Sequence, residues 1–156
     1  MHRRDRYQKV LAVSLALVLL FTACHHETEQ DRVKKVVLSV QKDAEAKQIR
    51  SVLDRIARNY RDPQGNDYDG IKGLLAYYFF RHQAISVYIP DIAVTVSEGT
   101  AQATFQAILT GRDAGSGGTV IPEALGMYTF TVALVKVKSE WLVSSAKWER
   151  AAEQGP

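Results

Sequence analysis

Few residues of the chain have a type and spacing that suit chemistry, and the first is Cys24, the only cysteine among 156 residues. A lone cysteine cannot form an internal disulfide. His25 and His26 follow it directly, but a zinc site needs three or four converging ligands, and two adjacent histidines lack such partners. We therefore expect no metal site and no cofactor. The segment that precedes Cys24 indicates a different role for the thiol.

Residues 1–23 have the three-part order of a secretory signal, with a positive start, an apolar run from Val10 to Phe21 and small residues before Cys24. The apolar run is too short for a stable span, because a bilayer core of about 30 Å needs roughly 20 apolar residues. The segment 20–24 resembles the bacterial lipobox, although Phe21 stands where leucine is more usual. This resemblance implies cleavage before Cys24 and attachment of lipid to its sulfur.

The predicted organisation is a lipoprotein signal peptide at 1–23, a lipidated tether at 24–30, one domain at 31–150 and a polar tail at 151–156. The lipid anchor makes a membrane the first expected partner, in the cell envelope. The residue after the expected lipidated cysteine is His25 and not an aspartate. In this respect the chain resembles lipoproteins that are sorted to the outer membrane. In a Gram-negative host we expect the periplasmic face of that membrane.

Removal of the signal changes the charge of the chain. The full sequence has 20 Lys and Arg against 17 Asp and Glu. The segment before Cys24 contains four bases and one acid, which leaves 16 against 16. A neutral domain gives no reason to expect nucleic acid or an anionic surface as a partner. The remaining length suits one domain with an adequate core.

The first half of the domain has helical periodicity. One apolar set runs from Val33 to Ala44 and a second from Ile49 to Tyr60. The two sets lie on opposite sides of a continuous helix, which predicts two helices with a break at 46–48. After a loop at 61–67, Asp67 or Asp69 can cap a third helix. That helix would turn inward five apolar residues, Ile71, Leu74, Leu75, Tyr78 and Phe79.

After His82 the apolar period becomes two, which is typical of strands. The alternation changes parity at Pro90–Asp91, where a bulge or bend would absorb the slip. The next strand presents alanines from Ala101 on one face, and further strands are expected at 127–137 and 141–148. A long glycine-rich loop at 111–118 separates strands, and it lacks the following helix that a phosphate loop requires.

Three helices followed by an antiparallel meander define an α+β fold. The helix order, the strand pair 92–96 and 101–105, and the closing run 140–148 resemble the nuclear transport factor 2-like superfamily, which includes the SnoaL-like proteins. The resemblance implies three N-terminal helices packed on a curved antiparallel sheet, a cone with cystatin-like topology. It covers almost the whole domain and specifies function hardly at all.

Enzymes with this fold place acids, histidines or tyrosines inside the cone, and the resemblance therefore implies His82, Tyr88, Asp91 and Tyr128 as candidate catalytic residues. None of them repeats a family catalytic motif, and each also has a structural interpretation. We expect a non-catalytic domain that binds a small apolar ligand or an envelope protein at the mouth of the cone or on the exposed sheet face. The alternative is a pocket enzyme with isomerase-, dehydratase- or cyclase-like acid–base chemistry.

Overall fold

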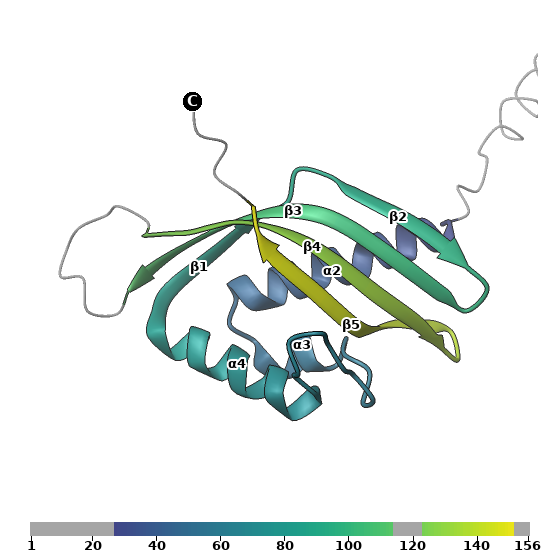
Figure 1. Ribbon diagram of the computed structural model, residues 1–156, viewed down its shortest axis with the longest axis horizontal. Helices are drawn as coiled ribbons and strands as arrows, with labels where there is room; N and C mark the ends of the chain where they lie inside the picture. Colours follow the sequence, from purple (N-terminus) through teal and green to yellow (C-terminus); the bar gives the residue numbers. More distant parts are fainter. Residues whose placement is uncertain (1–26, 114–122, 152–156) are drawn as a thin grey trace, which may run out of the picture.

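The computed structural model describes residues 27–113 and 123–151, and it confirms the α+β class with helices first and a curled antiparallel sheet after them (Figure 1). The elements are α2 (Glu29–Glu45), α3 (Ile49–Leu53), α4 (Tyr68–Arg81), β1 (His82–Tyr88), β2 (Ile92–Ser97), β3 (Thr100–Asp113), β4 (Glu123–Val137) and β5 (Glu140–Arg150). The predicted signal peptide, Cys24, most of the predicted glycine-rich loop and residues 152–156 of the predicted tail lie outside the described residues. No helix in the described ranges combines the length and apolarity needed to cross a bilayer.

Helix α2 begins at Glu29, so the last two residues of the predicted tether belong to the helix. Thr28 caps it through a reciprocal pair of bonds: its hydroxyl accepts from the Asp31 backbone N–H at 3.1 Å, and the Asp31 carboxylate accepts from the Thr28 N–H at 3.1 Å. This capping box satisfies two amide groups that a helix start otherwise leaves without partners. The folded domain therefore starts within a few residues of Cys24.

The second predicted helix is much shorter than expected. The prediction ran from Ile49 to Tyr60, but α3 ends at Leu53. Beyond it the backbone bonds to the edge of β5, where Ala57 N–H donates to the Val143 carbonyl at 2.8 Å and Val143 N–H donates to the Arg55 carbonyl at 2.9 Å. These bonds cover the free edge of β5 and replace the i to i−4 bonds of a helix.

Helix α4 begins where the sequence predicts, because the Asp67 carboxylate accepts from the Gly70 N–H at 2.9 Å. Its burial differs from the prediction. None of its fourteen residues is buried. Of the side chains expected to point inward, Tyr78 is exposed and the other four are half-buried. Its main neighbours are the adjoining strand β1 and helix α3. A helix this apolar with no buried residue is an unusual feature of the domain.

The sheet has the order β1–β3–β4–β5, and β2 also pairs with β3. The predicted change of parity at Pro90–Asp91 is confirmed as a break between two strands that pair with successive parts of β3. Because side chains alternate along a strand and opposite residues share a face, the register places Val87 and Val94 on the same side as the alanines of β3. We call this side, which the helices cover, the inner face and the other side the outer face.

The buried core occupies one half of the inner face, beneath α2 and residues 49–60 (Figure 1). We call it the closed half. Its buried members are Val33, Val36, Val37, Ile56, Tyr60, Ile92, Ala101, Ala103, Val132, Leu134, Trp141 and Val143. The alanines let α2 approach the sheet closely, so side chains of the helix fill the space above the small residues of β3.

Side chains of α2 also cap the free edge of β1. The Gln41 amide donates to the Val87 carbonyl at 2.6 Å, and the Glu45 carboxylate accepts from the Val87 N–H at 2.7 Å. Lys47 donates to the carbonyl of His82. The end of α2 thereby holds the strand that leads out of α4, and this fixes where α4 can lie relative to the sheet.

Candidate functional site

Two of the four predicted catalytic residues do not lie inside the fold. Tyr88 follows the inner residue Val87, so strand alternation places it on the outer face, where it is 62% exposed. Asp91 is exposed in the connection between β1 and β2. The expected inner position fails for Tyr88 because of the alternation along β1, and for Asp91 because it lies in the exposed connection.

His82 is the buried candidate, with 3% of its surface exposed. It ends α4, since its backbone N–H donates to the Tyr78 carbonyl, and it begins β1. Its ring stacks on Tyr78 with centroids 6.1 Å apart and planes 16° apart. His82 therefore ends the helix, and its imidazole is a buried polar ring.

Tyr128 lies on the inner face of β4, half-buried, with its ring centroid 6.4 Å from that of Phe130. It stands opposite Ala107 on β3, whereas His82 stands opposite Asp113. These positions are six residues apart along β3, which corresponds to about 20 Å of strand. The register therefore separates His82 from Tyr128 and brings no two of the four predicted residues together as an acid–base pair.

Arg150 is a site residue that the sequence gave no reason to select. It stands directly opposite Tyr128 in the β4–β5 ladder, so the two side chains share the inner face. Gly126 makes room for it: a Cβ atom at that position would lie 2.9 Å from Nε of Arg150, and the backbone there has φ of 116°. Only the strand register reveals this pair of a phenol and a guanidinium.

Several apolar side chains of the inner face and of α4 lie outside the buried core. Phe105 and Phe130 stack at the border of the core with centroids 5.2 Å apart. Beyond them come half-buried residues outside the core, on the inner face of the sheet and on α4. We call these residues, with Tyr128 and Arg150, the open half. They are Leu74, Leu75, Phe79, Leu109 and Trp148.

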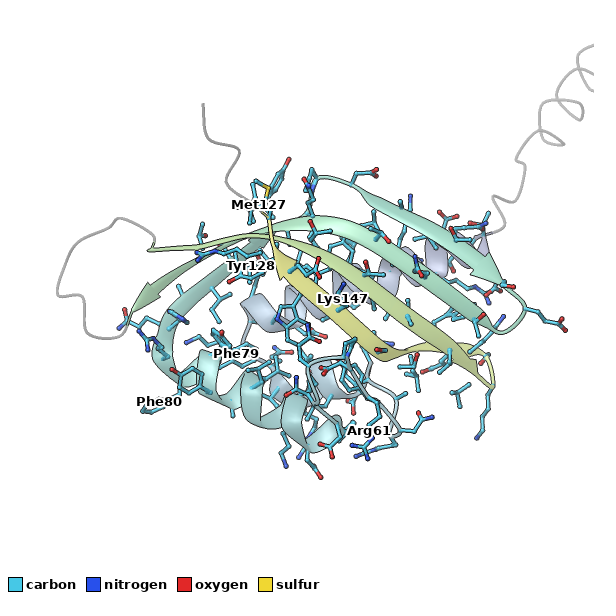
Figure 2. All side chains as sticks on the ribbon, in the orientation of Figure 1. Arg61, Phe79, Phe80, Met127, Tyr128 and Lys147 are labelled. Carbon is cyan, nitrogen blue, oxygen red and sulfur yellow. The ribbon has the colours of Figure 1, made fainter. Side chains whose placement is uncertain are left out.

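Figure 2 shows how adjacent residues of α4 differ. Phe79 lies on the side of the helix that faces the sheet, while Phe80 points outward and is 89% exposed. Figure 2 also shows Tyr128 and Met127 in the first part of β4, and the alternation along that strand assigns Tyr128 to the inner face and Met127 to the outer one. The open half is therefore bounded by α4 on one side and by the first part of β4 and the end of β5 on the other.

The closed half contains a buried hydroxyl that holds a loop. Tyr60 is buried and donates from its hydroxyl to the Asp62 carboxylate at 3.0 Å. Burial, and then this bond to an acceptor carboxylate, raise the pKa of the Tyr60 phenol well above its usual value. Asp62 also accepts from the Asn66 backbone N–H at 2.8 Å. The network keeps the phenol neutral and fixes the loop that precedes α4, so we assign it a structural role.

A surface groove of about 470 Å³ lies elsewhere, between the start of α2 and the β4–β5 turn. Two of the three cations that line it, Arg32 and Lys35, pair with Glu27. Glu29 beside it accepts from Trp141 Nε1 at 2.8 Å and from Lys136 Nζ at 2.9 Å. These bonds, the one from Lys136 first, lower the pKa of the Glu29 carboxyl. The bonds of Glu29 beside the groove thus connect the start of α2 to β4 and β5.

The fold has relatives of known structure. The chain is similar to a candidate scytalone dehydratase from Novosphingobium aromaticivorans, with 14% identity, a TM-score of 0.68, and 79% of this chain and 84% of that chain covered. It is similar to a protein from the same organism described as nuclear transport factor 2-like with a cystatin-like fold, with 10% identity, a TM-score of 0.65, and 92% and 90% covered. A third is a candidate dehydratase of the nuclear transport factor 2-like family from Streptomyces avermitilis, with 12% identity, a TM-score of 0.66, and 79% and 96% covered.

These likenesses show that the chain has the nuclear transport factor 2-like, cystatin-like fold, as the sequence resemblance implied. No protein-family model matches the chain. No curated protein matches its sequence. At such low identities the structural likeness defines the fold and leaves the function to the site.

Proposed function

We propose that the domain binds a small, flat, largely apolar molecule that carries a carboxylate or a carbonyl oxygen. The observation that carries the proposal is the Tyr128–Arg150 pair on the inner face, next to apolar residues that the chain itself leaves half-buried. A guanidinium and a phenol can both donate to one oxygen-bearing group. Binding sites of this kind combine an apolar lining with a few placed polar groups.

The apolar part of the ligand would lie between α4 and the sheet. Phe79 on the helix and Trp148 on β5 supply aromatic surfaces there. Removing apolar surface from water contributes roughly 25 cal/mol per Å². A ligand that covers these half-buried side chains would therefore bind more tightly by removing their apolar surface from water. Because α4 has no buried residue, it is the element that the ligand would stabilise most.

Native mass spectrometry of the protein purified from its original host tests this proposal. We expect a bound small molecule at one copy per chain, and its mass would identify the compound class. Arg150→Gln should weaken retention of the molecule about tenfold or more, because a charge-assisted hydrogen bond contributes roughly 1.5–3 kcal/mol. Tyr88→Ser on the outer face is the matched control and should retain it. Equal loss in both variants would contradict the inner site.

A second candidate function is acid–base catalysis on an apolar molecule that lies beside His82, at the other end of the inner face from the Tyr128–Arg150 pair. The observation that favours it is the buried imidazole of His82, together with the dehydratase descriptions of two structural relatives. In a dehydration, a base takes a proton from carbon and the neighbouring hydroxyl leaves as water after it is protonated. His82→Gln distinguishes the two functions: lost turnover with retained binding supports an enzyme, and unchanged behaviour supports a binding domain.

We further propose that Cys24 carries lipid and tethers the domain in the cell envelope, at the periplasmic face of the outer membrane in a Gram-negative host. The support is the lipobox-like segment and His25 after the cysteine. Metabolic labelling with an alkyne fatty acid should mark the parent chain and fail to mark Cys24→Ala. Fractionation that finds the protein wholly in the inner membrane would reject the assigned location.

A further inference from the structure

We propose that the surface groove beside the start of α2 binds the zwitterionic headgroup of phosphatidylethanolamine, with its phosphate on Arg55 and its ammonium on Glu140. The proposal goes beyond the inner site and rests on the proposed lipidation of Cys24. The groove has a volume of about 470 Å³ and is lined by α2, by the segment after α3 and by the β4–β5 turn. This volume lies within the range of about 300–1,000 Å³ that is typical of small-molecule sites.

The groove lies at the end of the domain from which the chain leads back to Cys24. Figure 1 shows the purple start of α2 and the β4–β5 turn at the same end, while the connection from α4 to β1 lies at the other. Glu27 lines the groove, and it is three residues away from Cys24. Three residues span at most about 11 Å. Lipid on Cys24 would therefore hold the groove beside the headgroup layer, where the effective concentration of headgroups is high.

The groove presents charges of both signs. Arg32 and Lys35 pair with Glu27. Within the described residues, neither Arg55, the third cation, nor the carboxylate of Glu140 forms an ion pair. A guanidinium can bind a phosphate through two N–H groups, and a carboxylate can accept from a primary ammonium, which has three donors. The pair therefore matches an ethanolamine headgroup better than a choline headgroup, whose quaternary ammonium has no N–H.

The fold fixes the position of Arg55. Its carbonyl accepts from the Val143 N–H at 2.9 Å, which holds this part of the backbone against the edge of β5. Its side chain is half-buried, and two buried apolar residues, Val36 and Trp141, line the same groove. A charge that is partly removed from water is costly unless it is paired. A bound phosphate would supply the counter-charge that Arg55 does not find among the described residues.

The turn between β4 and β5 also suits contact with lipid. Val137 is an exposed apolar residue, and Lys138, which follows it, is exposed and adopts a positive φ of 58°. A lysine can lay its apolar stem along a lipid surface while its ammonium reaches the phosphates. The next two residues, Ser139 and Glu140, line the groove. One end of the domain thus combines a headgroup site with side chains that suit the surrounding lipids.

Native mass spectrometry of the full chain, isolated from its host in detergent and titrated with phosphatidylethanolamine, tests the proposal. We expect one bound lipid per chain. Arg55→Gln should weaken binding about tenfold or more, because it removes the guanidinium that holds the phosphate. Lys72→Gln removes an exposed cation of α4 and is the matched control, which should bind like the parent chain.

Glu140→Gln provides a second variant at an exposed turn position, and it keeps the test decisive if Arg55→Gln fails to fold. It should weaken binding of phosphatidylethanolamine and remove the preference for this lipid over phosphatidylcholine. The soluble compound glycerophosphoethanolamine should bind at least tenfold more weakly than the lipid, since it is not held beside the groove by a shared micelle. Equal binding of the two would assign the groove to a soluble compound and overturn the proposal.

The mass of the isolated chain separates a failure of this proposal from a failure of the proposed tether. A chain without lipid on Cys24 would reject the tether and the headgroup site together. A lipidated chain that binds no phosphatidylethanolamine, or binds it equally in Arg55→Gln and Lys72→Gln, would reject the headgroup site alone. Lost binding in Arg150→Gln with full binding in Arg55→Gln would also reject it, because the lipid would then occupy the open half.

Discussion

The closed and open halves of the inner face use the same sheet in opposite ways. In the closed half, small residues of β3 lie under α2, and Leu134 keeps only 1% of its surface exposed. In the open half, larger side chains face α4, and no residue of that helix is buried. The depth of packing therefore distinguishes the two halves: the closed half is buried, and the open half leaves its side chains half-buried or exposed.

The two tryptophans of β5 show the same contrast within one strand. Trp141 is buried and donates to Glu29 at the start of α2. Trp148 is half-buried opposite Phe130, and its carbonyl accepts from Gln64 at 3.3 Å. The first belongs to the core, and the second keeps part of its surface exposed.

The largest effect should come from truncation in the closed half. Leu134→Ala is expected to lower the free energy of unfolding by about 3 kcal/mol, because a cavity forms among side chains that cannot collapse. Phe79→Ala in the open half should cost less than about 1 kcal/mol, since the ring is only half-buried. Urea denaturation followed by circular dichroism measures both. Similar losses in the two variants would remove the distinction between the halves.

An intermediate loss is expected at Tyr60. Tyr60→Phe removes the hydroxyl that donates to Asp62 in a buried setting, which should cost about 1–2 kcal/mol. Because the folded-state pKa is raised, the neutral phenol stabilises the fold fully at pH values below the unfolded pKa near 10, and this is lost as pH rises toward the folded value. Absorbance at alkaline pH should show that Tyr60 ionises only as the protein unfolds. Ionisation before unfolding would contradict the assignment.

A change at Gly126 should affect the open half with little cost to the core. In Gly126→Ala the new Cβ would meet the Arg150 guanidinium, and the backbone would keep a φ that alanine rarely adopts. We expect about 1 kcal/mol of destabilisation and a displaced Arg150. Ligand affinity should fall as in Arg150→Gln. Gly99→Ala is the control, because Gly99 also has a positive φ but has open space around it. It reports the effect of backbone strain without a side-chain clash.

The smallest effect concerns acid stability. The folded-state pKa of Glu29 is depressed, first by the bond from Lys136, so its contribution is complete above the unfolded value near 4.5 and is lost as pH falls through the folded value. Glu29→Gln should therefore flatten the loss of melting temperature between neutral pH and pH 3. An acid profile identical to that of the parent chain would show that this exposed carboxylate has no measurable role.

Local rules predicted much of the fold. The break after α2, the Asp67 cap and the change of strand parity at Pro90–Asp91 each depend on residues near one another in sequence. The end of α3 could not be predicted, because its last turns give way to bonds with Val143, far along the chain. Apolar periodicity does not show whether other residues will cover a helix face. For this reason the burial predicted for α4 was wrong.

The site was predicted less well, for the same reason. His82 was recognised by its type, but its burial arises from the stacking on Tyr78 and from the capped edge of β1. The pairing of Tyr128 with Arg150 requires the register of β4 and β5, and no spacing in the sequence encodes it. Cys24 and the predicted signal peptide stay predictions, since they lie outside the described residues.

Binding of anilinonaphthalene sulfonate, a flat apolar anion, tests the central claim most directly. The account predicts saturable fluorescence enhancement at one site per chain, weakened about tenfold or more by Arg150→Gln and by Phe79→Ala and unchanged by Tyr88→Ser. Non-saturable enhancement, or an equal loss with Tyr88→Ser, would contradict a binding site in the open half.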